Sequence, residues 1–582
     1  MYSHNSLLNN KWKIKNCDER KSLMISQRYN LSLILGKLLT LRNIKDEQVQ
    51  NFLNPIFKNN IPNPFELKDM DKSINRTIKN IINKKKIGII ADYDVDGSTS
   101  AALLYNFFSF FKCSISLKIP DRLNEGYGPN KRIMDEFSNE KINLVFSLDC
   151  GTTSFEILDH PNYKEIDVII IDHHISEHEL PNIYSIINPN RFDEDSELKD
   201  LAAVGVTFLF IMGLRKILRE NNYFDDKKNE PNLLINIDLV ALGTVCDVVN
   251  LSDYNRNFII KGLEIIKQRT HKGISQIIDN SNIKHSPTAN DLSFIIGPQL
   301  NAASRIDDSS LSYKLLISNS LIDIETITKK LFLLNEKRKL IESNIYNHAL
   351  EQAKKQINKK FLLVYGVGWH KGILGIIASR LVEKFDKPAI VISLDQSIGI
   401  GSARSIKEID LGNIILLAKR EGLLLSGGGH KMAAGLKIQI NLIDQFHQYL
   451  LQSFEQFSES LFQKINLYDV KLSVNEINLD LLEQLENLEP FGNGNEEPKF
   501  IVQGLRIDHC KVLKEKHVLI FFRSDYGIDI KGISFNSFGT NLGENLINNK
   551  SSKFDFGCFI KKDYFNDELK PQLIIEDAML VN

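Results

Sequence analysis

Hydrophobic and polar positions along this chain follow the period of helices in some segments and that of strands in others. Between about residues 80 and 250, short runs rich in β-branched residues (87–91, 142–149 and 166–172) alternate with segments of helical spacing. Continuous apolar runs separated by helices predict a parallel sheet that is covered on both faces. Each run ends in an acid or directly before one. Ligands of such sheets bind at the carboxyl ends of the strands, where these acids are expected to lie.

A long helical pattern follows this block. Residues 323 to 360 contain neither Gly nor Pro and repeat apolar positions at helical spacing. They predict a single connecting helix, and therefore a domain boundary. After it the chain resumes strand, Gly-rich turn and helix, which predicts a smaller α/β domain. Period-two segments separated by turn residues then predict a small β-barrel or sandwich. We therefore expect an N-terminal extension (1–50), a catalytic α/β domain (51–320), the connecting helix (321–360), a smaller α/β domain (361–450) and a β domain (466–582).

Composition narrows the class of protein. At 582 residues the chain is too long to fold around one hydrophobic core, since domains average about 150 residues. With 43% hydrophobic and 25% charged residues it is typical of globular proteins, and no apolar run approaches the roughly 20 residues that span a bilayer. The first residues lack the apolar core of a signal peptide, so we expect a cytoplasmic protein without a membrane partner.

Cysteine content and charge exclude further classes. Six scattered cysteines without a CxxC pair argue against a zinc ribbon or a disulfide framework and favour a reducing compartment. The net charge of −1 means that a polyanion would have to bind to a local patch.

Three acids alternate in the stretch DYDVDG, directly after the first apolar run. Asp92, Asp94 and Asp96 cannot all face one way in an extended strand, so this segment is expected to be a loop. Gly97 would then permit the turn into a helix that begins near Ser98. Helix capping is the alternative interpretation, because Asp before Gly-Ser-Thr is a common N-terminal signal.

The next two strand ends change this interpretation. Asp149 closes one run and Asp172-His173-His174 closes the other, so five acids and two histidines are expected at one edge of the sheet. Uncompensated carboxylates would repel and raise one another's pKa. Carboxylates with imidazole suit Mn²⁺ or Mg²⁺, and missing Cys ligands speak against structural zinc. Two such ions are a common device for hydrolysing phosphodiesters.

The later part of the chain offers groups that suit phosphate. GSARS places Ser402 and Arg404 two apart on an extended stretch, and SGGGH places His430 beside flexible backbone N–H groups. Together they could cradle an anion, although GSARS alone could be an ordinary β-turn. In the first domain, PDRLNEGYG offers Arg122 for a phosphate contact and Tyr127 for stacking on a base. Core packing of Tyr127 is an equal alternative.

DYDVDG, SLDCGTT, IDHH and LVALGTVCDVV resemble, in order and spacing, the four motifs of the DHH phosphoesterases. LAAVGVTF, GPQLNAASRI, GWHKGILGIIASRL, GSARS, SGGGHKMAAG and LEPFGNGNEEPKF extend the resemblance to the bacterial members that degrade single-stranded DNA from the 5′ end. It covers essentially residues 50 to 580. It implies a DHH catalytic domain, a smaller DHH-associated domain that binds substrate, and a C-terminal OB-fold barrel.

The resemblance also assigns roles to residues. It implies two Mn²⁺ or Mg²⁺ ions, with Asp149 as the bridging ligand and His174 facing the scissile phosphate. Arg305 would hold the 5′ phosphate together with Ser402 and Arg404. The implied metal ligands are Asp92, Asp94, Asp96, Asp149, His173 and Asp247, and catalysis is expected from Asp149, His174 and Asp96.

Simpler interpretations stay open for two of these residues, and two positions depart from the family pattern. Asp247 could be a capping acid, and Arg305 could form a surface ion pair with Asp307 or Asp308. The first departure is Ser304, which stands where Gly normally precedes this arginine, so it would need a permitted φ or local strain. The second is Cys246, which stands beside the acid of the fourth motif, where Ala is common.

The expected function is a single-stranded-DNA-specific 5′–3′ exonuclease that releases mononucleotides and acts in recombination and mismatch repair. Its expected partners are single-stranded DNA and, as suppliers of that strand, a helicase and a single-strand-binding protein; a monomer is the default. A phosphodiesterase for short oligoribonucleotides or cyclic dinucleotides is the alternative, and a scaffold with a degenerate site is a third. Candidates for DNA contacts in the β domain are Lys511, Lys514, Lys516, His517 and Arg523.

Overall fold

The computed structural model describes residues 5–224, 230–523, 530–549, 552–565 and 568–581. The chain divides into two units. The central unit comprises Phe57–Ser458 together with Gly492–Gly494, and the terminal unit comprises Met1–Ile56, Glu459–Phe491 and Asn495–Asn582. Among the described residues, no helix combines the length and apolar character needed to cross a bilayer.

A five-stranded parallel sheet organises the first half of the central unit, in the order β3-β2-β4-β5-β6. The parallel sheet expected from the apolar runs is confirmed. Hydrogen bonding continues past the strand ends, because the N–H groups of Asp92, Asp149 and Asp172 each donate to the neighbouring strand or its end. Three acids therefore lie in adjacent positions along one edge. The strands are β2 (Ile87–Ala91), β3 (Ile115–Lys118), β4 (Leu144–Leu148), β5 (Asp167–Ile171) and β6 (Ser185–Ile187).

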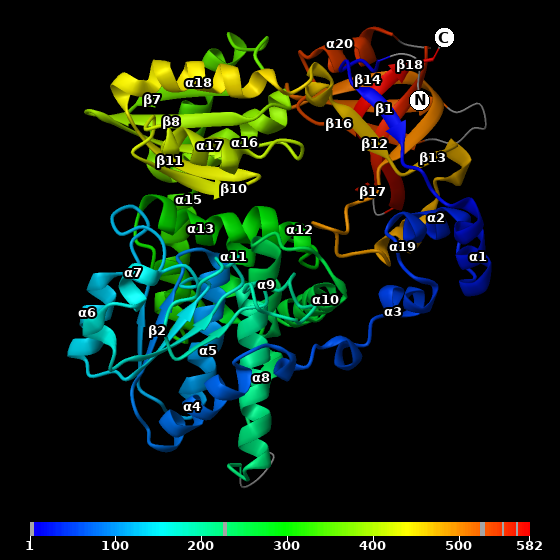
Figure 1. Ribbon diagram of the computed structural model, residues 1–582. Helices are drawn as coiled ribbons and strands as arrows, with labels where there is room; N and C mark the ends of the chain where they lie inside the picture. The colour runs from blue at the N-terminus through cyan, green and yellow to red at the C-terminus, as the bar shows by residue number, and fades with distance from the viewer. Residues whose placement is uncertain (1–4, 225–229, 524–529, 550–551, 566–567, 582) are drawn as a thin grey trace. The chain divides into compact units, whose positions relative to one another are not determined.

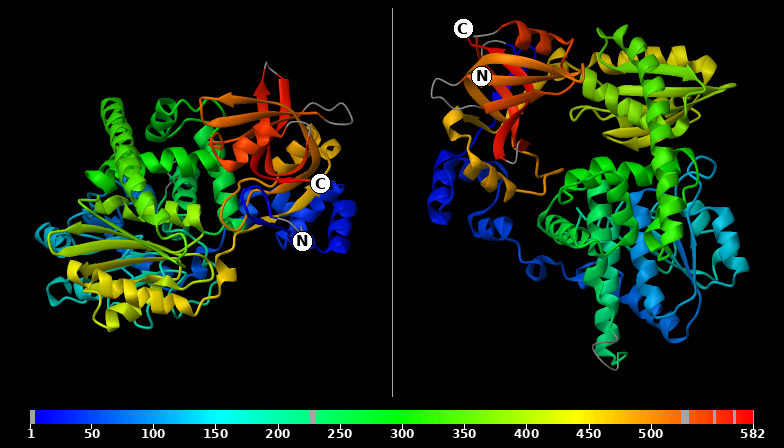
Figure 2. Two further views of the ribbon diagram at one scale, coloured as in Figure 1. Left: turned by 90° about the horizontal axis from the view of Figure 1, so that it is seen from above. Right: turned by 180° about the vertical axis from the view of Figure 1, so that it is seen from behind.

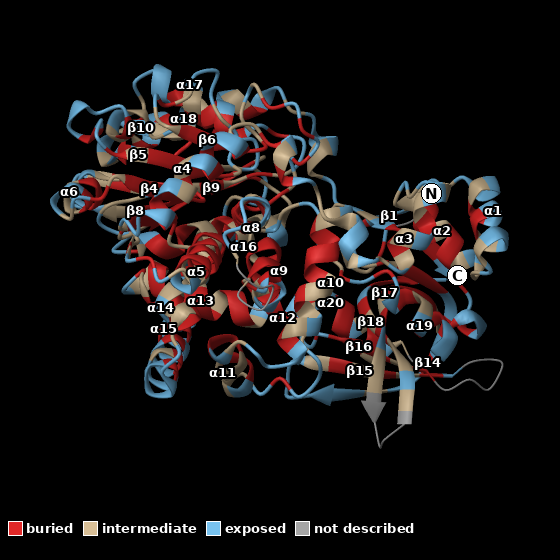
Figure 3. Cartoon of the chain, turned by 90° about the horizontal axis from the view of Figure 1, so that it is seen from below, coloured by how far each residue is buried: buried red, intermediate tan, exposed pale blue. Residues whose placement is uncertain are grey.

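Helices cover both faces of this sheet, as expected for runs that are apolar throughout (Figure 1). Alternate residues of each strand enter two separate cores: Phe146 packs with α5 and α8, whereas Val145 packs with α6. Figure 3 shows α5 and α9 as largely buried. One face carries α4 (Met70–Ile82), α5 (Val95–Phe110), α8 (Ala203–Glu220) and α9 (Ile237–Cys246), and the other carries α6 (Lys131–Asn139) and α7 (Phe155–Leu158).

Further helices lead to the long connecting helix, α15 (Leu321–Lys354), visible in Figure 2. The helix ends at Lys354 and not at residue 360. The last turn of α15 and the residues after it are bonded to the next strand, since Gln352 Nε2 donates to Tyr365 O (2.7 Å) and Gln356 Nε2 donates to Leu363 O (2.8 Å). The preceding helices are α10 (Asp253–Lys267), α11 (Lys272–Asn280), α12 (Ala289–Asp291), a π-helical turn (Leu292–Ile296), α13 (Gly297–Ile306) and α14 (Leu311–Ile317).

The second sheet of the central unit is mixed, in the order β10-β11-β9-β8-β7, and only β7 and β8 run parallel. The expected flexible turn SGGGH is in fact strand β10, and GSARS lies on strand β9 and not in a β-turn. Both segments satisfy their backbone groups by pairing with β11. The elements are β7 (Leu362–Val367), α16 (Leu374–Phe385), β8 (Ala389–Asp395), β9 (Ile398–Arg404), α17 (Leu411–Arg420), β10 (Ser426–His430), β11 (Ala433–Gln439) and α18 (Ile443–Glu455).

The terminal unit contains a closed barrel, since pairing of β14 with β17 joins the two sides of the series β14-β15-β16-β18-β17. The expected C-terminal barrel is confirmed. The C-terminal part of this unit contains β12 (Ile465–Tyr468), β13 (Val470–Leu472), α19 (Leu479–Glu486), β14 (Phe500–Leu513), β15 (His517–Arg523), β16 (Ile530–Ser534), α20 (Asn541–Asn548), β17 (Lys553–Phe565) and β18 (Glu568–Leu580).

The N-terminal residues, which the pattern left unassigned, belong to the core of this same unit. Strand β1 (Lys11–Ile14) pairs in parallel with β12, and Trp12 packs on Tyr468 with ring centroids 4.9 Å apart. Leu38 and Phe52 pack in one cluster with residues of the barrel. The helices involved are α1 (Glu19–Tyr29), α2 (Leu33–Leu41) and α3 (Val49–Leu53).

Candidate active site

The loop after β2 presents three acids within five residues. Helix α5 begins at Val95, three residues before the expected start, because Asp94 acts as its N-cap and accepts from Gly97 N (3.0 Å). Gly97 is required here, since a Cβ atom would lie 2.3 Å from Asp92 O. Helix capping therefore occurs at Asp94 and not at Asp96, the acid directly before Gly-Ser-Thr, which lies in the first turn of α5. Capping does not exclude a metal role, because an oxygen of Asp94 also lies close to oxygens of Asp92 and Asp149.

The structure brings all six predicted metal ligands together at this edge. His173 Nε2 lies 3.4 Å from Asp149 Oδ1, 3.4 Å from Asp247 Oδ2 and 3.9 Å from Asp96 Oδ2. The ligand atoms form three overlapping groups that could each hold an ion: Asp92, Asp94 and Asp149; Asp96, His173 and Asp247; and Asp149, His173 and His174. The first two groups together contain all six predicted ligands. Asp149 belongs to the first and lies 3.4 Å from His173 of the second, which is the position that a bridging ligand needs.

Three buried atoms of this cluster are without a hydrogen-bond partner among the described residues: Asp92 Oδ1, Asp149 Oδ1 and His173 Nε2. An unsatisfied buried polar atom costs about 1–3 kcal/mol, and more if it is charged. Nine-tenths or more of such atoms are normally satisfied, so three in one cluster call for a ligand. Oxygen and imidazole donors fit Mn²⁺ or Mg²⁺.

The pKa values of the cluster also favour a bound cation. Burial, followed by the charges of neighbouring acids, raises the pKa of Asp96 to about 7 and of Asp247 to about 9, and raises the pKa of Asp149 well above its usual range. Burial and the nearby His174 lower the pKa of His173 to about 4, so its imidazole is neutral at pH 7. A neutral imidazole among carboxylates offers a lone pair to a cation.

A pH dependence of stability follows from the raised pKa values of Asp96 and Asp247. Between about pH 4 and these values, the folded protein keeps protons that the unfolded chain has released, so stability is lost as pH rises. In EDTA we expect a lower melting temperature, measured by circular dichroism, at pH 9 than at pH 6. Mn²⁺ should raise the melting temperature more at pH 9, because it binds ionised carboxylates.

The variant Asp247→Asn serves as the control for this experiment, because it removes one of the two titrating groups and should flatten the pH dependence. A larger stabilisation by Mn²⁺ at pH 6 than at pH 9 would contradict the metal assignment.

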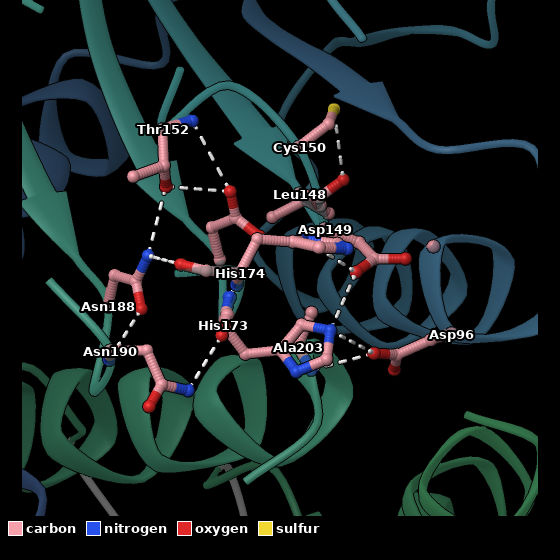
Figure 4. Close-up of polar contacts among 12 residues, drawn as sticks. Asp96, Leu148, Asp149, Cys150, Thr152, His173, His174, Asn188, Asn190 and Ala203 are labelled. Carbon is pink, nitrogen blue, oxygen red and sulfur yellow. Dashed lines mark hydrogen bonds and ion pairs between the residues drawn. The ribbon is translucent and has the colours of Figure 1, made fainter. Parts of the chain in front are cut away.

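Asp172, which was counted among the acids from the sequence but was given no role of its own, holds both histidines. Figure 4 shows His173 and His174 with Thr152 and the two asparagines described below. Asp172 Oδ1 accepts from His173 N (2.8 Å) and lies 2.8 Å from His174 Nδ1, while Oδ2 accepts from Thr152 Oγ1 (2.6 Å). Burial alone would lower the pKa of His174, but the hydrogen bond and charge of Asp172 outweigh it and raise that pKa to about 9. His174 is therefore a cation at pH 7.

Two asparagines complete this network and were also missed. Asn188 Nδ2 donates to Thr152 Oγ1 (3.0 Å) and to His174 O (2.8 Å), and Asn190 Nδ2 donates to His173 O (2.7 Å). Both asparagines follow β6, in the sequence NPN, which has the composition of an ordinary turn. The only feature of the sequence that could have indicated their contacts to the histidines is their position after another strand of the same sheet.

Tyr127 lies beside the same histidine. Its hydroxyl donates to Asp149 O (2.9 Å) and lies 3.1 Å from His174 Nδ1, and the side chain is 45% exposed. Core packing of Tyr127 is therefore the wrong interpretation. Arg122 places its guanidinium 4.7 Å from the centre of the Tyr93 ring, next to Asp92 and Asp94 in sequence. Both predicted DNA contacts in the first domain thus lie near the acidic cluster.

The residues of β9 that were predicted to bind phosphate lie side by side. Ser402 and Arg404 occupy alternate positions of the strand, and Arg404 Nη1 donates to Ser402 Oγ (3.3 Å). Arg404 pairs in register with Ala433, which pairs with His430, so the three predicted residues share one face of the sheet.

Arg305 reaches the start of α16, where its Nη1 donates to Gly372 O (3.1 Å). The alternative interpretation of Arg305, a surface ion pair, is wrong, because Asp307 and Asp308 pair with Lys330 (3.0 Å) and Lys314 (3.6 Å). Ser304 needs no unusual φ, since it lies within helix α13.

The arginines of the two halves of the central unit influence one another. Burial and then the charge of Arg122 lower the pKa of Arg305 to about 10 and also lower that of Arg404. The charge of Arg122 thus acts on both Arg305 and Arg404, and an anion bound near these arginines would offset the repulsion.

The predicted contacts of the terminal unit lie around the β14–β15 hairpin. Lys511 Nζ lies 5.5 Å from the centre of the Phe521 ring, on which His509 stacks at 4.2 Å. His517 contacts Phe535, with ring centroids 5.3 Å apart. Lys514 lies in the turn with φ 49, Lys516 precedes β15, and Arg523 ends it. Basic groups with exposed aromatics are typical of surfaces that bind single strands.

Comparisons with known proteins agree with this architecture. Residues 86–244 match the DHH family, N-terminal domain, residues 358–456 match the DHHA1 domain, and residues 468–577 match the RecJ OB domain. The chain is 33% identical to the single-stranded-DNA-specific exonuclease RecJ of Dickeya dadantii (strain 3937), over 78% of this chain and 81% of the relative. It is 28% identical to the RecJ of Bacillus subtilis (strain 168), over 98% of this chain and 70% of the relative.

A solved structure extends the comparison to the fold. The crystal structure of RecJ in complex with Mn²⁺ from Thermus thermophilus matches with a TM-score of 0.81 and 22% identity, covering 98% of this chain and 79% of that one. The two chains therefore share their fold.

Proposed function

The chain belongs to the RecJ family of single-stranded-DNA-specific exonucleases, and on this premise we propose that it hydrolyses single-stranded DNA from the 5′ end with two Mn²⁺ or Mg²⁺ ions. The observation that carries the proposal is the buried cluster of five carboxylates and one imidazole, in which Asp149 belongs to two groups of ligand atoms. When bound, the ions activate a water molecule and offset the charge that develops on the scissile phosphate.

The protein's own residues divide the remaining work. Asp92, Asp94, Asp96, Asp149, His173 and Asp247 are proposed to hold the ions. His174, kept cationic by Asp172, would stand beside the cluster and stabilise negative charge on the phosphate oxygens. Tyr127 would help to hold the His174 ring at the same Nδ1 atom that Asp172 contacts, through the hydroxyl that also donates to Asp149 O.

The second sheet supplies a separate place for the 5′ phosphate. Arg305, Arg404 and Ser402 meet near the start of α16: a Cβ atom on Gly375 would lie 3.0 Å from Arg404 Nη2 and 3.2 Å from Ser402 Oγ. A helix N-terminus with guanidinium groups favours a phosphate. A terminal phosphate held here while the acidic cluster cuts the next linkage would give 5′ polarity and release of mononucleotides.

The terminal unit argues against the dinucleotide phosphodiesterase alternative, because its closed barrel matches the RecJ OB domain. The complete ligand set argues against a degenerate scaffold.

Partners and location belong to the proposal as well. A helicase and a single-strand-binding protein are proposed to supply the strand, with the chain acting as a monomer in recombination and repair. The six cysteines are free thiols, which favours the reducing environment of the cytoplasm.

End-labelled oligonucleotides test the function directly. Single-stranded and duplex DNA, labelled at the 5′ or the 3′ end and carrying a 5′ phosphate or hydroxyl, are incubated with Mn²⁺, Mg²⁺ or EDTA. We expect early release of labelled mononucleotide from the 5′ end of single strands alone, faster with a 5′ phosphate and abolished by EDTA. Preferred cleavage of dinucleotides, or release from the 3′ end, would contradict the proposal.

A further inference from the structure

Three residues from the C-terminal part of the chain, Gly492–Gly494, belong to the central unit. They lie against the loop that directly follows Asp247, the last of the candidate metal ligands. Leu251 N donates to Asn493 O (2.8 Å), and Asn493 Nδ2 donates back to Val248 O (3.2 Å). Asn493 therefore binds both ends of a four-residue turn.

The turn contains an unfavourable backbone conformation. Val248 has φ 61, in the left-handed region that a β-branched residue rarely adopts, and its side chain is 65% exposed. Burial of the side chain does not compensate for this conformation, so other contacts must hold it. The hydrogen bond from Asn493 to the Val248 carbonyl is such a contact.

The segment fits the turn closely. Gly494 has φ 78, and a Cβ atom there would lie 1.6 Å from Asn250 Oδ1. A Cβ atom on Gly492 would lie 2.9 Å from Leu251 Cδ1. Glycine is required at position 494, where φ is positive and the backbone approaches Asn250 most closely.

Hydrogen bonds also link this turn to the segment that contacts Asp96, a second candidate metal ligand. Asn250 Nδ2 donates to Asp200 Oδ2 (3.0 Å), and Asn255 Nδ2 donates to the main-chain oxygens of Asp200 (2.6 Å) and Asn250 (2.8 Å). Three residues after Asp200, Ala203 N donates to Asp96 Oδ2 (2.7 Å). The same network thus borders Asp247 and Asp96, which share one group of ligand atoms with His173.

We propose that Asn493 is a positioning residue for the metal site: it holds the strained turn at Val248 and so keeps Asp247 Oδ2 near His173 Nε2, at the observed 3.4 Å. The inference rests on the proposed function, in which Asp247 is a metal ligand. Residues that orient metal ligands commonly change metal affinity by about 10- to 100-fold when they are replaced.

The first test measures Mn²⁺ binding to the full-length protein, by the loss of the electron paramagnetic resonance signal of free Mn²⁺. We expect Asn493→Ala and the nearly isosteric Asn493→Asp to weaken one Mn²⁺ site about tenfold or more. Hydrogen exchange in metal-free protein should become faster in a peptide containing Val248 to Leu251. Unchanged Mn²⁺ affinity in both variants would overturn the inference.

A rescue variant separates positioning from general stability. Val248→Gly relieves the left-handed strain, so the turn should depend less on Asn493. The double variant Val248→Gly/Asn493→Ala should therefore bind Mn²⁺ more tightly than Asn493→Ala alone. A double variant that binds no better than Asn493→Ala would contradict the role of strain.

Two controls complete the design. Asn83→Ala removes the same kind of bond, from Asn83 Nδ2 to Lys79 O (2.8 Å), at the opposite end of β2, and should leave Mn²⁺ binding unchanged. Asp247→Asn tests the premise: if this variant keeps full Mn²⁺ affinity, the assignment of Asp247 fails. If it loses affinity while Asn493→Ala does not, the inference alone fails.

Discussion

Replacing Asp149 by Asn is expected to lower the rate of mononucleotide release at least about a thousandfold, because loss of about 4 kcal/mol of transition-state stabilisation corresponds to three orders of magnitude. Asp149 is the carboxylate that belongs to two groups of candidate ligand atoms, and its Oδ1 is buried without a hydrogen-bond donor among the described residues. An amide carries no charge and would leave the bridging position unfilled.

The substitution is also one that the fold should accept. Asp149 has φ 59, a conformation that Asn adopts readily, and its N–H bond to Ile171 O (2.9 Å) does not involve the side chain. We therefore expect the variant to bind single-stranded DNA in a gel-shift assay while failing to cut it. The control Asp386→Asn makes the same change at another left-handed residue (φ 52), the C-cap of α16, and should stay active. Near-normal cleavage by Asp149→Asn would refute the site.

The second large effect is expected from Asp172→Asn, which should lower kcat by roughly 10²- to 10⁴-fold. Losses of this size are typical when the acid that orients a catalytic histidine is removed. Asp172 outweighs the effect of burial and keeps the pKa of His174 at about 9. Without the hydrogen bond and charge of Asp172, burial would be opposed only by the charges of Asp247 and Asp92, so the pKa of His174 would fall. Less of the cationic form would then stand beside the phosphate.

A pH profile of kcat distinguishes this explanation from simple misfolding. In the wild-type protein, activity that needs cationic His174 should fall as pH rises through about 9. In Asp172→Asn that fall should move to a lower pH by one unit or more. Asp135→Asn, which alters a carboxylate bonded to Tyr163 Oη (2.7 Å) away from the cluster, is the matched control and should leave the profile in place. An unshifted profile in Asp172→Asn would rule out this role.

Local patterns in the sequence were sufficient to predict much of this protein. The apolar runs predicted β2, β4 and β5, the absence of Gly and Pro predicted α15, and acids after successive parallel strands predicted a shared edge. These predictions succeed because a buried parallel strand must be apolar throughout, and because the ends of adjacent strands meet.

Other features depend on partners distant in sequence, and only the tertiary structure decided them. The role of Asp172 follows from Thr152 and His174 together, and SGGGH becomes strand β10 because β11 lies beside it. Trp12 becomes core because Tyr468 and Asp577, from the far end of the chain, complete its surroundings.

Asn493 shows the same limit most clearly. Its segment has the composition of an ordinary turn, and nothing local relates it to Asp247. The sequence by itself therefore determined the strands, the long helix and the acids that are candidates for metal binding, since strands and helices depend on local periodicity and the candidate acids depend on side-chain chemistry and on the family resemblance. The tertiary structure decided which residues orient those acids, because hydrogen bonds between distant segments exist only once the chain has folded.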